Sequence, residues 1–279
     1  MQGVASSNPA VPTKKDKAQQ LTLLGFLSCH GDFQRPEWPV NIDYSYISEY
    51  IDAIMSTLPR SLTSFPPRGT VYGTLLNFRD ALDALGDVVH RPPYKAPPQA
   101  PILYIKPRNT IAADGDSIVV PSGVETLEVG ASLGLVIGRS ACSVSEAQAL
   151  EFVSDYVVVN DISVPHNSYY RPALRFKCRD GFCPIGTPVA RATVADPNAL
   201  TLSVEIDGIE VQRTSTNGLV RPVARLLAEV TEFMTLHPGD VLMIGVPAGA
   251  PRARPGQRVS VSIDRVGRLR NTLIAEADA

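Results

Sequence analysis

The chain has 279 residues, of which 44% are hydrophobic and 19% charged, and its formal net charge is −2. These values are typical of a globular protein with a buried core, and they argue against the basic surface with which proteins bind nucleic acid. No apolar run is long enough to cross a bilayer, and the polar, Lys-bearing N-terminus lacks a signal-peptide cleavage pattern. We therefore expect no nucleic-acid partner, no membrane partner and a cytoplasmic location.

The first 67 residues are predicted to be an N-terminal extension that docks on the main domain or on a partner. Residues 1–20 are rich in Ser, Asn, Pro, Lys and Gln with few apolar anchors, which predicts disorder. Residues 43–58 carry apolar side chains at helical spacing and are predicted to form a helix that ends at Pro59.

From Gly69 onward the pattern changes to short apolar runs separated by turn residues. Residues 70–76 have strand composition, residues 78–86 suit a short helix, and the five prolines of 91–101 predict a stiff loop. Further strands are expected near 102–105, 117–120, 133–137, 156–159, 202–206, 241–244 and 259–263. Helices are predicted over 143–154, with a capping box formed by Ser143 and Glu146, and over about 221–234. This pattern predicts a β-dominated α+β fold rather than regular βαβ alternation.

Neither the cysteines nor a match to a nucleophile motif makes a strong case for a metal site or a nucleophilic serine. The four cysteines (Cys29, Cys142, Cys178 and Cys183) lack zinc-site spacing and are expected to be free, buried thiols. Residues 130–134 match the G-x-S-x-G nucleophile motif around Ser132. That motif requires a following helix, whereas here a strand-like run follows, so a serine hydrolase is not favoured.

The densest polar segment is 160–187, directly after a strand that looks buried. Clustered Lys and Arg beside Tyr hydroxyls suit an anionic small molecule, and a solvated loop with incidental charge is the alternative. His166 lies in this segment and is a candidate for ligand contact. No two histidines are spaced as a metal-binding pair.

Six blocks, two of which overlap this segment, resemble the fumarylacetoacetate hydrolase family, in family order. They are 105–107, 134–138, 159–163, 177–186, 236–240 and 266–272. The resemblance implies a mixed β-roll or barrel with a few peripheral helices, and a catalytic domain over 68–275. Segments 93–98, 105–110 and 170–186 are similar to one subgroup, the first halves or first subunits of bifunctional isomerase/decarboxylases of 4-hydroxyphenylacetate (homoprotocatechuate) catabolism.

The resemblance implies an enzyme that acts on a small 2-oxo or 2-hydroxy-diene di- or tricarboxylate. Such reactions are the decarboxylation of 5-oxopent-3-ene-1,2,5-tricarboxylate and the isomerisation of 2-hydroxyhepta-2,4-diene-1,7-dioate. Both pass through an enolate, which we expect Lys177 to stabilise. The candidate catalytic residues are Lys177, Asp161 and Asp180. The candidate substrate-binding residues are Lys106, His166, Tyr170, Arg171, Arg179 and Gly245.

The group that moves the proton stays open among Asp161, Tyr169, Tyr170 and His166. The family's hydrolytic members carry a His where this chain has Ala81, so C–C bond hydrolysis is less expected than lyase or isomerase chemistry.

The family's metal ligands are largely missing from this sequence. The resemblance implies a Glu-x-Glu pair at the positions of Gly130 and Ser132, which leaves Asp161 as the one carboxylate ligand. Because Mg²⁺ requires several oxygen ligands, we expect no metal or a weakly bound Mg²⁺. The family's substrate-contacting Thr-Gly-Thr-Pro reads 244–247 Ile-Gly-Val-Pro here. A non-catalytic subunit beside a metal-bearing paralogue is therefore one alternative, and a divergent 2-oxo-acid C–C lyase or hydrolase is another. A homodimer or a heteromer with a second family subunit is expected.

Overall fold

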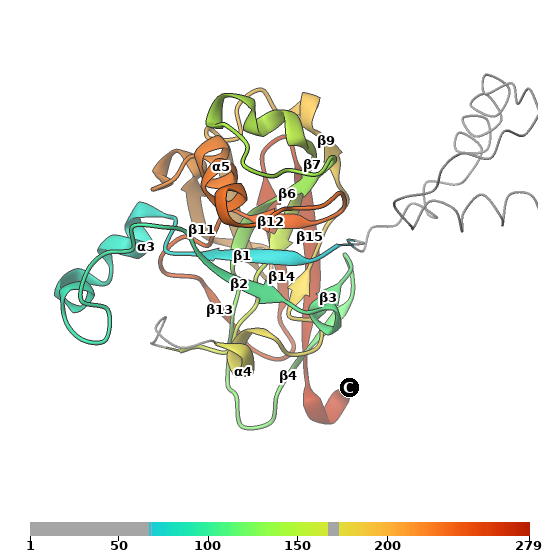
Figure 1. The fold of residues 1–279 in the computed structure, drawn as a ribbon. Helices are drawn as coiled ribbons and strands as arrows, with labels where there is room; N and C mark the ends of the chain where they lie inside the picture. The colour runs from blue at the N-terminus through green and yellow to red at the C-terminus, as the bar shows by residue number, and fades with distance from the viewer. Residues whose placement is uncertain (1–66, 68, 167–172) are drawn as a thin grey trace, which may run out of the picture. The chain divides into compact units, whose positions relative to one another are not determined.

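Two mixed β-sheets form the framework of the described chain in this computed structural model, which describes residues 67, 69–166 and 173–279 (Figure 1). One sheet has the strand order β2-β1-β12-β6-β7-β9 and the other has the order β11-β10-β14-β15-β4. In each, a single pair is parallel, β1 with β12 and β15 with β4, and the other pairs are antiparallel.

The strands of the first sheet are β1 (Val71–Leu75), β2 (Ile102–Lys106), β6 (Ala131–Ile137), β7 (Val153–Asn160), β9 (Val189–Ala190) and β12 (Val241–Met243). The second sheet contains β4 (Ser117–Val120), β10 (Thr201–Ile206), β11 (Ile209–Ser215), β14 (Arg258–Ile263) and β15 (Gly267–Ala275). Two small sheets pair β3 (Ile111–Ala112) with β8 (Cys183–Pro184) and β5 (Leu127–Glu128) with β13 (Arg252–Ala253). The predicted β-dominated fold class is confirmed.

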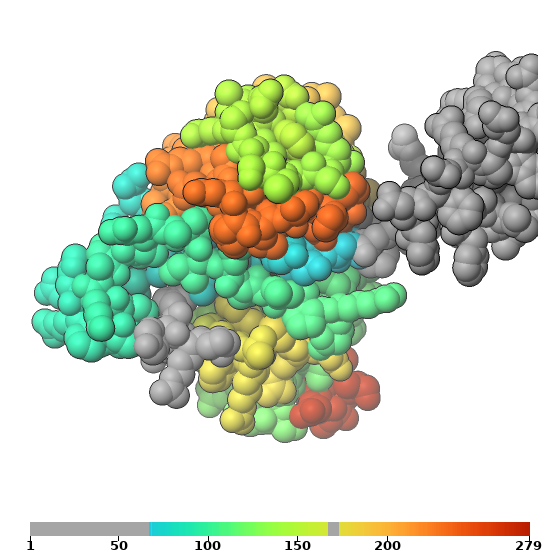
Figure 2. Space-filling view, viewed as in Figure 1, coloured from blue at the N-terminus to red at the C-terminus, as the bar shows by residue number. Residues whose placement is uncertain are grey.

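The helices are short apart from α5. They are α3 (Arg79–Asp83), α4 (Leu174–Lys177) and α5 (Val223–Phe233). The described chain also contains short 3₁₀ helices, which are η2 (Gly86–His90), η3 (Arg108–Thr110), η4 (Glu146–Phe152), η5 (Arg191–Thr193), η6 (Thr216–Gly218) and η7 (Glu276–Asp278). Helix α5 packs beside η4, and the space-filling view shows the two adjoining on one face (Figure 2).

Strands β6 and β7 form the centre of the first sheet, and both read as nearly continuous apolar runs because both of their faces are covered. All seven residues of β6 are buried. One face packs on the main core with α5, and the other on a smaller cluster that includes Val157, Val159 and Val241. Gly134 makes this packing possible, because a Cβ there would lie 2.7 Å from Val157 Cγ1 and 2.9 Å from Val241 Cγ1.

Most of the predicted strands and helices occur close to the residues expected for them, but the prediction of an α-helix over 143–154 was wrong. The segment predicted as a helix over 143–154 is the 3₁₀ segment η4, which begins at Glu146. Ser143 adopts a φ of +48° and does not cap η4. Ser145 precedes η4 instead, and its hydroxyl donates a hydrogen bond to Gln148 Oε1. The predicted extension 1–67, with its helix over 43–58, lies outside the described residues apart from Pro67.

Two long strands, β11 and β15, were not predicted. In β15 the buried Leu269, Asn271 and Leu273 alternate with the exposed Arg268 and Arg270. The charged outer face and the central Asn hid the period-2 pattern of a half-buried strand.

Cys142, Cys178 and Cys183 are free, as predicted, but only Cys183 is buried. The expectation of burial was wrong for Cys142, which is exposed, and Cys178 is partly buried. Ser132 is 0% exposed near the start of β6, and the strand continues to Ile137, so a nucleophile elbow is not formed. None of the helices in the described part of the chain has the length and apolar character that crossing a membrane requires.

Replacing Leu226 with Ala tests whether α5 anchors the core. Leu226 is 0% exposed in the main core, so we expect Leu226→Ala to lower the free energy of unfolding by about 2–5 kcal/mol in urea titrations. Ile209→Ala is the control, because Ile209 is 69% exposed and its replacement should change stability by less than about 0.5 kcal/mol. Equal effects of the two substitutions would contradict this account of the core.

Candidate active site

A cavity of about 360 Å³ opens beside the C-terminal end of β7. Its size falls in the range of small-molecule sites. It is lined by the end of β1, by Tyr104 of β2, by Lys177 of α4 and by the loop between β12 and β13. The polar or charged lining side chains are Thr74, Tyr104, Glu128, Asp161, Ser163, His166, Lys177 and Arg252.

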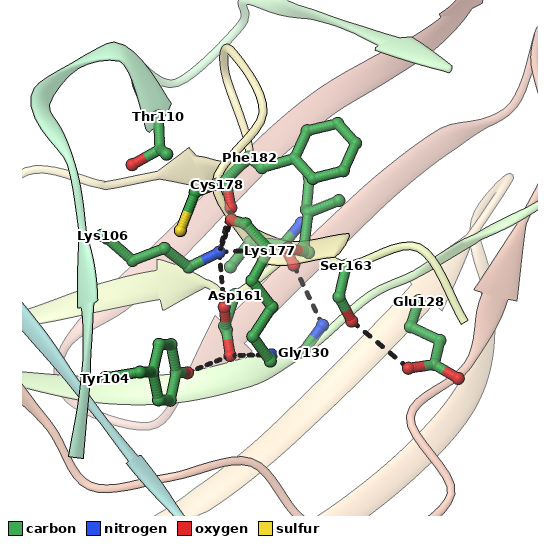
Figure 3. Close-up of polar contacts among 12 residues, drawn as sticks. Tyr104, Lys106, Thr110, Glu128, Gly130, Asp161, Ser163, Lys177, Cys178 and Phe182 are labelled. Atoms are coloured by element: carbon green, nitrogen blue, oxygen red, sulfur yellow. Dashed lines mark hydrogen bonds and ion pairs between the residues drawn. The ribbon is translucent and has the colours of Figure 1, made fainter. Parts of the chain in front are cut away.

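Asp161 lies at the base of this cavity between two lysines. Its carboxylate oxygens lie 2.6 Å from Lys106 Nζ and 2.8 Å from Lys177 Nζ, and the Tyr104 hydroxyl donates a short hydrogen bond to it (Figure 3). The Asp161 side chain is only 1% exposed. Its backbone is fixed from the neighbouring strand, because its N–H donates to the Gly130 carbonyl at 2.8 Å.

The two lysines lower the pKa of Asp161. Burial by itself raises the pKa of this carboxyl, but the ammonium groups of Lys106 and Lys177 outweigh burial and hold the pKa well below its usual range. Asp161 therefore stays ionised across the pH range in which enzymes work, as an anion that fixes the two cations.

Lys106 is buried beneath Asp161 and does not line the cavity. Besides its ion pair, its ammonium donates to the carbonyls of Ile162, Lys177 and Phe182 at 3.1, 2.8 and 2.8 Å. Lys106 was predicted to bind substrate. The structure instead places its ammonium between three pieces of chain, which are the loop after β7, helix α4 and the segment before β8. Lys106 therefore holds together the segments that carry Asp161 and Lys177.

Lys177 presents its ammonium to the cavity. It is the last residue of α4, and its Nζ lies 5.0 Å from the centre of the Tyr104 ring as well as against Asp161. One ion pair occupies one of the three ammonium donors, so a ligand oxygen can accept from the others. This arrangement can stabilise negative charge that develops on a bound oxo group.

Tyr104 is part of this cluster and was missed by the sequence analysis. Its ring lies against Gly73 on the paired strand, where a Cβ would come within 2.0 Å of the ring. Burial first, and then the Asp161 charge, raise the pKa of Tyr104 well above its usual value. The available signal was strand periodicity, since Tyr104 and Lys106 are two apart on β2 and therefore share a face.

A second polar group, also missed, lines the cavity beyond Ser163. Ser163 Oγ lies 3.3 Å from Glu128 Oε2, and Arg252 lies 3.4 Å from Glu128 Oε1. Glu128 and Ser163 also pair through their backbones, and Arg252 is opposite Glu128 in the β5–β13 pair. Figure 3 shows Ser163 between Asp161 and Glu128.

The other predicted site residues divide into three groups. His166 lines the cavity, with its ring stacked on Phe176 at 5.1 Å and its Nδ1 3.1 Å from the Val164 carbonyl. Asp180, Arg179 and Gly245 do not line it: exposed Asp180 accepts from Asn109, and Arg179 donates to the Arg175 carbonyl. Tyr170 and Arg171 lie outside the described residues.

The positions implied for a family metal do not fit one here. Gly130 and Ser132 supply no carboxylate, and both oxygens of Asp161 are engaged by ammonium groups. A Cβ at Gly130 would lie 2.6 Å from the Asp161 carbonyl oxygen and 3.0 Å from Val246 Cγ2. A side chain at 130 would therefore require the Asp161 backbone, and to a smaller extent Val246, to move. Within residues 67, 69–166 and 173–279, no group of three His, Cys, Asp or Glu is arranged to hold a metal ion.

Comparison with known proteins identifies the family. The family model for the fumarylacetoacetate (FAA) hydrolase C-terminal domain matches residues 70–274. The chain belongs to the fumarylacetoacetate hydrolase family. It is 40% identical over 211 residues to the 4-hydroxyphenylacetate degradation bifunctional isomerase/decarboxylase of Escherichia coli, a match that covers 76% of this chain and 48% of that protein. The chain thus spans about half the length of the bifunctional relatives of this kind.

Solved structures of this enzyme family share the fold. The 5-carboxymethyl-2-hydroxymuconate delta-isomerase of Mycobacterium smegmatis is similar with a TM-score of 0.63 and 29% identity, covering 74% of this chain and 79% of that one. The fumarylpyruvate hydrolase of Pseudomonas aeruginosa, solved in complex with Mn²⁺ and pyruvate, has a TM-score of 0.66 and 26% identity, covering 76% and 91%.

Neutralising Asp161 should destabilise the protein strongly. Asp161→Asn leaves two buried ammonium groups facing each other without a counter-charge, so we expect the free energy of unfolding to fall by about 3–5 kcal/mol. Asp180→Asn is the matched control, because Asp180 is exposed. Urea denaturation of both variants measures the difference, and similar stabilities would show that the Asp161 cluster does not stabilise the fold.

The ion pairs of Asp161 with the two lysines also predict how the stability of the protein depends on pH. Because the folded-state pKa of Asp161 is depressed, its contribution is present above the unfolded-state pKa of about 4 and is lost as the pH falls through the lower folded value. The stability gap between wild type and Asp161→Asn should therefore stay constant from about pH 8 to about pH 5 and narrow below about pH 4. A gap that closes already near neutral pH would contradict the assigned direction.

Proposed function

We propose that this chain is a decarboxylase and isomerase of small 2-oxo or 2-hydroxy-diene di- or tricarboxylates, with Lys177 as the group that stabilises the enolate. The observation that carries the proposal is the Lys177 ammonium, held by Asp161 at 2.8 Å and facing a cavity of substrate size. The E. coli relative is named for 4-hydroxyphenylacetate degradation. This supports substrates such as 5-oxopent-3-ene-1,2,5-tricarboxylate and 2-hydroxyhepta-2,4-diene-1,7-dioate.

The reaction then needs few protein groups. In decarboxylation the C–C bond to the departing carboxylate breaks, CO₂ leaves, and the electron pair moves through the conjugated chain to the 2-oxo oxygen. Lys177 donates hydrogen bonds to that oxygen as its charge grows. Asp161 and Tyr104 hold the ammonium in place, and Lys106 holds Asp161. Arg252, which lines the same cavity and is 57% exposed, suits a distal carboxylate of the substrate.

We further propose that the charge on the oxygen is balanced by Lys177 rather than by a resident divalent cation. The support is local: the Asp161 oxygens are paired with ammonium groups, and the site around Gly130 excludes a glutamate side chain without rearrangement.

A second candidate function is that of a subunit that completes a metal-bearing paralogue. Two observations favour it: the chain spans about half the length of the E. coli relative, and the carboxylate positions at 130 and 132 are lost. In that case Lys177 would be a remnant, and the partner, a second family subunit, would hold the catalytic metal. A homodimer is the arrangement we propose if the chain is active alone.

Replacing Lys177 with Met should abolish turnover of the decarboxylase substrate. Met keeps the length of the side chain but removes its charge and donors, so we expect CO₂ release to fall by about 10²–10³-fold, as for loss of an oxyanion donor. Lys95→Met is the control, because Lys95 is exposed and does not line the cavity. Wild-type activity should be the same in EDTA and in Mg²⁺.

Three outcomes decide between the candidates. Activity that survives in Lys177→Met would contradict the role of the lysine. Activity that EDTA abolishes and Mg²⁺ restores would contradict charge balance by Lys177 alone. A wild-type chain that is inactive alone, but activates a second family subunit even when it carries Lys177→Met, would support the partner function instead.

A further inference from the structure

The isomerisation requires a proton at a carbon remote from the 2-oxo oxygen. If Lys177 holds that oxygen, the proton must come from a group elsewhere on the cavity wall. We propose that Glu128 is this catalytic residue, and that it delivers the proton to the distal carbon of the conjugated chain. The inference rests on the function proposed above and names its proton-transfer group.

Three other ionisable groups in the cavity, Asp161, Tyr104 and Arg252, are poorly suited to the task. Asp161 is kept anionic between two ammonium groups, so it carries no proton to give. The Tyr104 proton is already donated to Asp161, and burial raises the pKa of this phenol well above its usual value. The Arg252 guanidinium does not release a proton in proteins.

Glu128 combines access to the cavity with access to solvent. It lines the same cavity as Lys177, and its side chain remains 22% exposed, so it can exchange protons with water between turnovers. Its two side-chain contacts, to Ser163 at 3.3 Å and to Arg252 at 3.4 Å, are long for hydrogen bonds to a carboxylate. Its carboxyl group is thus oriented but not saturated, in contrast to Asp161.

Glu128 and Lys177 line the same cavity at different places, so they can face different parts of one conjugated substrate. Ser163 follows Asp161 by two residues and lies between it and Glu128, so the carboxyl group is set apart from the ammonium along one wall of the cavity (Figure 3). The backbone pairing of Glu128 with Ser163 fixes this separation. A dienolate whose oxygen is at Lys177 would extend its distal carbon along this wall.

The proton transfer is balanced without a further reactant. The Glu128 carboxylate accepts, through water, the proton released by the 2-hydroxyl group, or takes one from solvent after decarboxylation. Its O–H bond then breaks, the electron pair of the dienolate forms the new C–H bond at the distal carbon, and the C–O bond of the enolate becomes the carbonyl again. Glu128 is left as the carboxylate with which the cycle began.

The test separates the two halves of the reaction in the full chain. CO₂ release and the ultraviolet absorbance of the hydroxydiene are followed in parallel for wild type, Glu128→Gln, His166→Gln and Glu125→Gln. Glu125 is exposed and does not line the cavity, so it is the matched carboxylate control. The product formed in D₂O is analysed by NMR for the configuration of the deuterium at the protonated carbon.

We expect Glu128→Gln to slow ketonisation far more than CO₂ release, so that the hydroxydiene accumulates. Its ketonisation should slow by about 10²–10⁴-fold, the usual contribution of a positioned acid or base. Deuterium should enter one face of the carbon in wild type and both faces in the variant, because water then protonates the diene unaided. The deuterium readout is independent of how much folded variant is recovered.

The inference would be overturned by stereospecific ketonisation at the wild-type rate in Glu128→Gln, or by loss of that step in His166→Gln alone. An equal decrease of both steps in Glu128→Gln would also overturn it, because it would indicate a role in binding. Absence of both steps in the wild-type chain would instead contradict the proposed function itself.

Discussion

The ion pairs of Asp161 with Lys106 and Lys177 are the constraint on which the site depends. Two ammonium groups and a carboxylate are removed almost completely from water, which is tolerable only when each charge is compensated at short range. Lys106 satisfies this requirement further by donating to three carbonyls, and those carbonyls belong to the loop after β7, to α4 and to the segment before β8. A single buried cation thereby joins the pieces of chain that form the base of the cavity.

This arrangement also explains how the chain departs from its family. A divalent cation near Asp161 would have to compete with two ammonium groups for the carboxylate oxygens. A Cβ at Gly130 would clash with the Asp161 carbonyl oxygen and would also meet Val246. Lys106 and Lys177 lie in blocks that resemble the family, so this chain departs from the family pattern by lacking carboxylates at 130 and 132, not by gaining lysines. The positive charge that can stabilise an enolate is therefore supplied here by Lys177.

The sequence allowed the prediction of much of the fold and of one half of the site. Apolar runs such as 133–137 and 156–159 marked the central strands because both faces of the sheet are buried there. Lys177 and Asp161 were found because they fall in a dense polar segment after one of these strands. Tyr104 and Glu128 were missed because each lies in a strand more than 30 residues away along the chain, and only sheet pairing brings them to the cavity. Asp180 was selected for its nearness in sequence to Lys177, yet it lies on the surface.

The most direct test of the central claim is calorimetry of oxalate, a planar dianion that resembles the enolate of a 2-oxo acid, with protein kept in EDTA. If Lys177 supplies the charge that the enolate needs, oxalate will bind to the wild-type chain without metal and will not bind to Lys177→Met. Binding that appears only after Mg²⁺ is added, and that the lysine substitution does not change, would contradict the account.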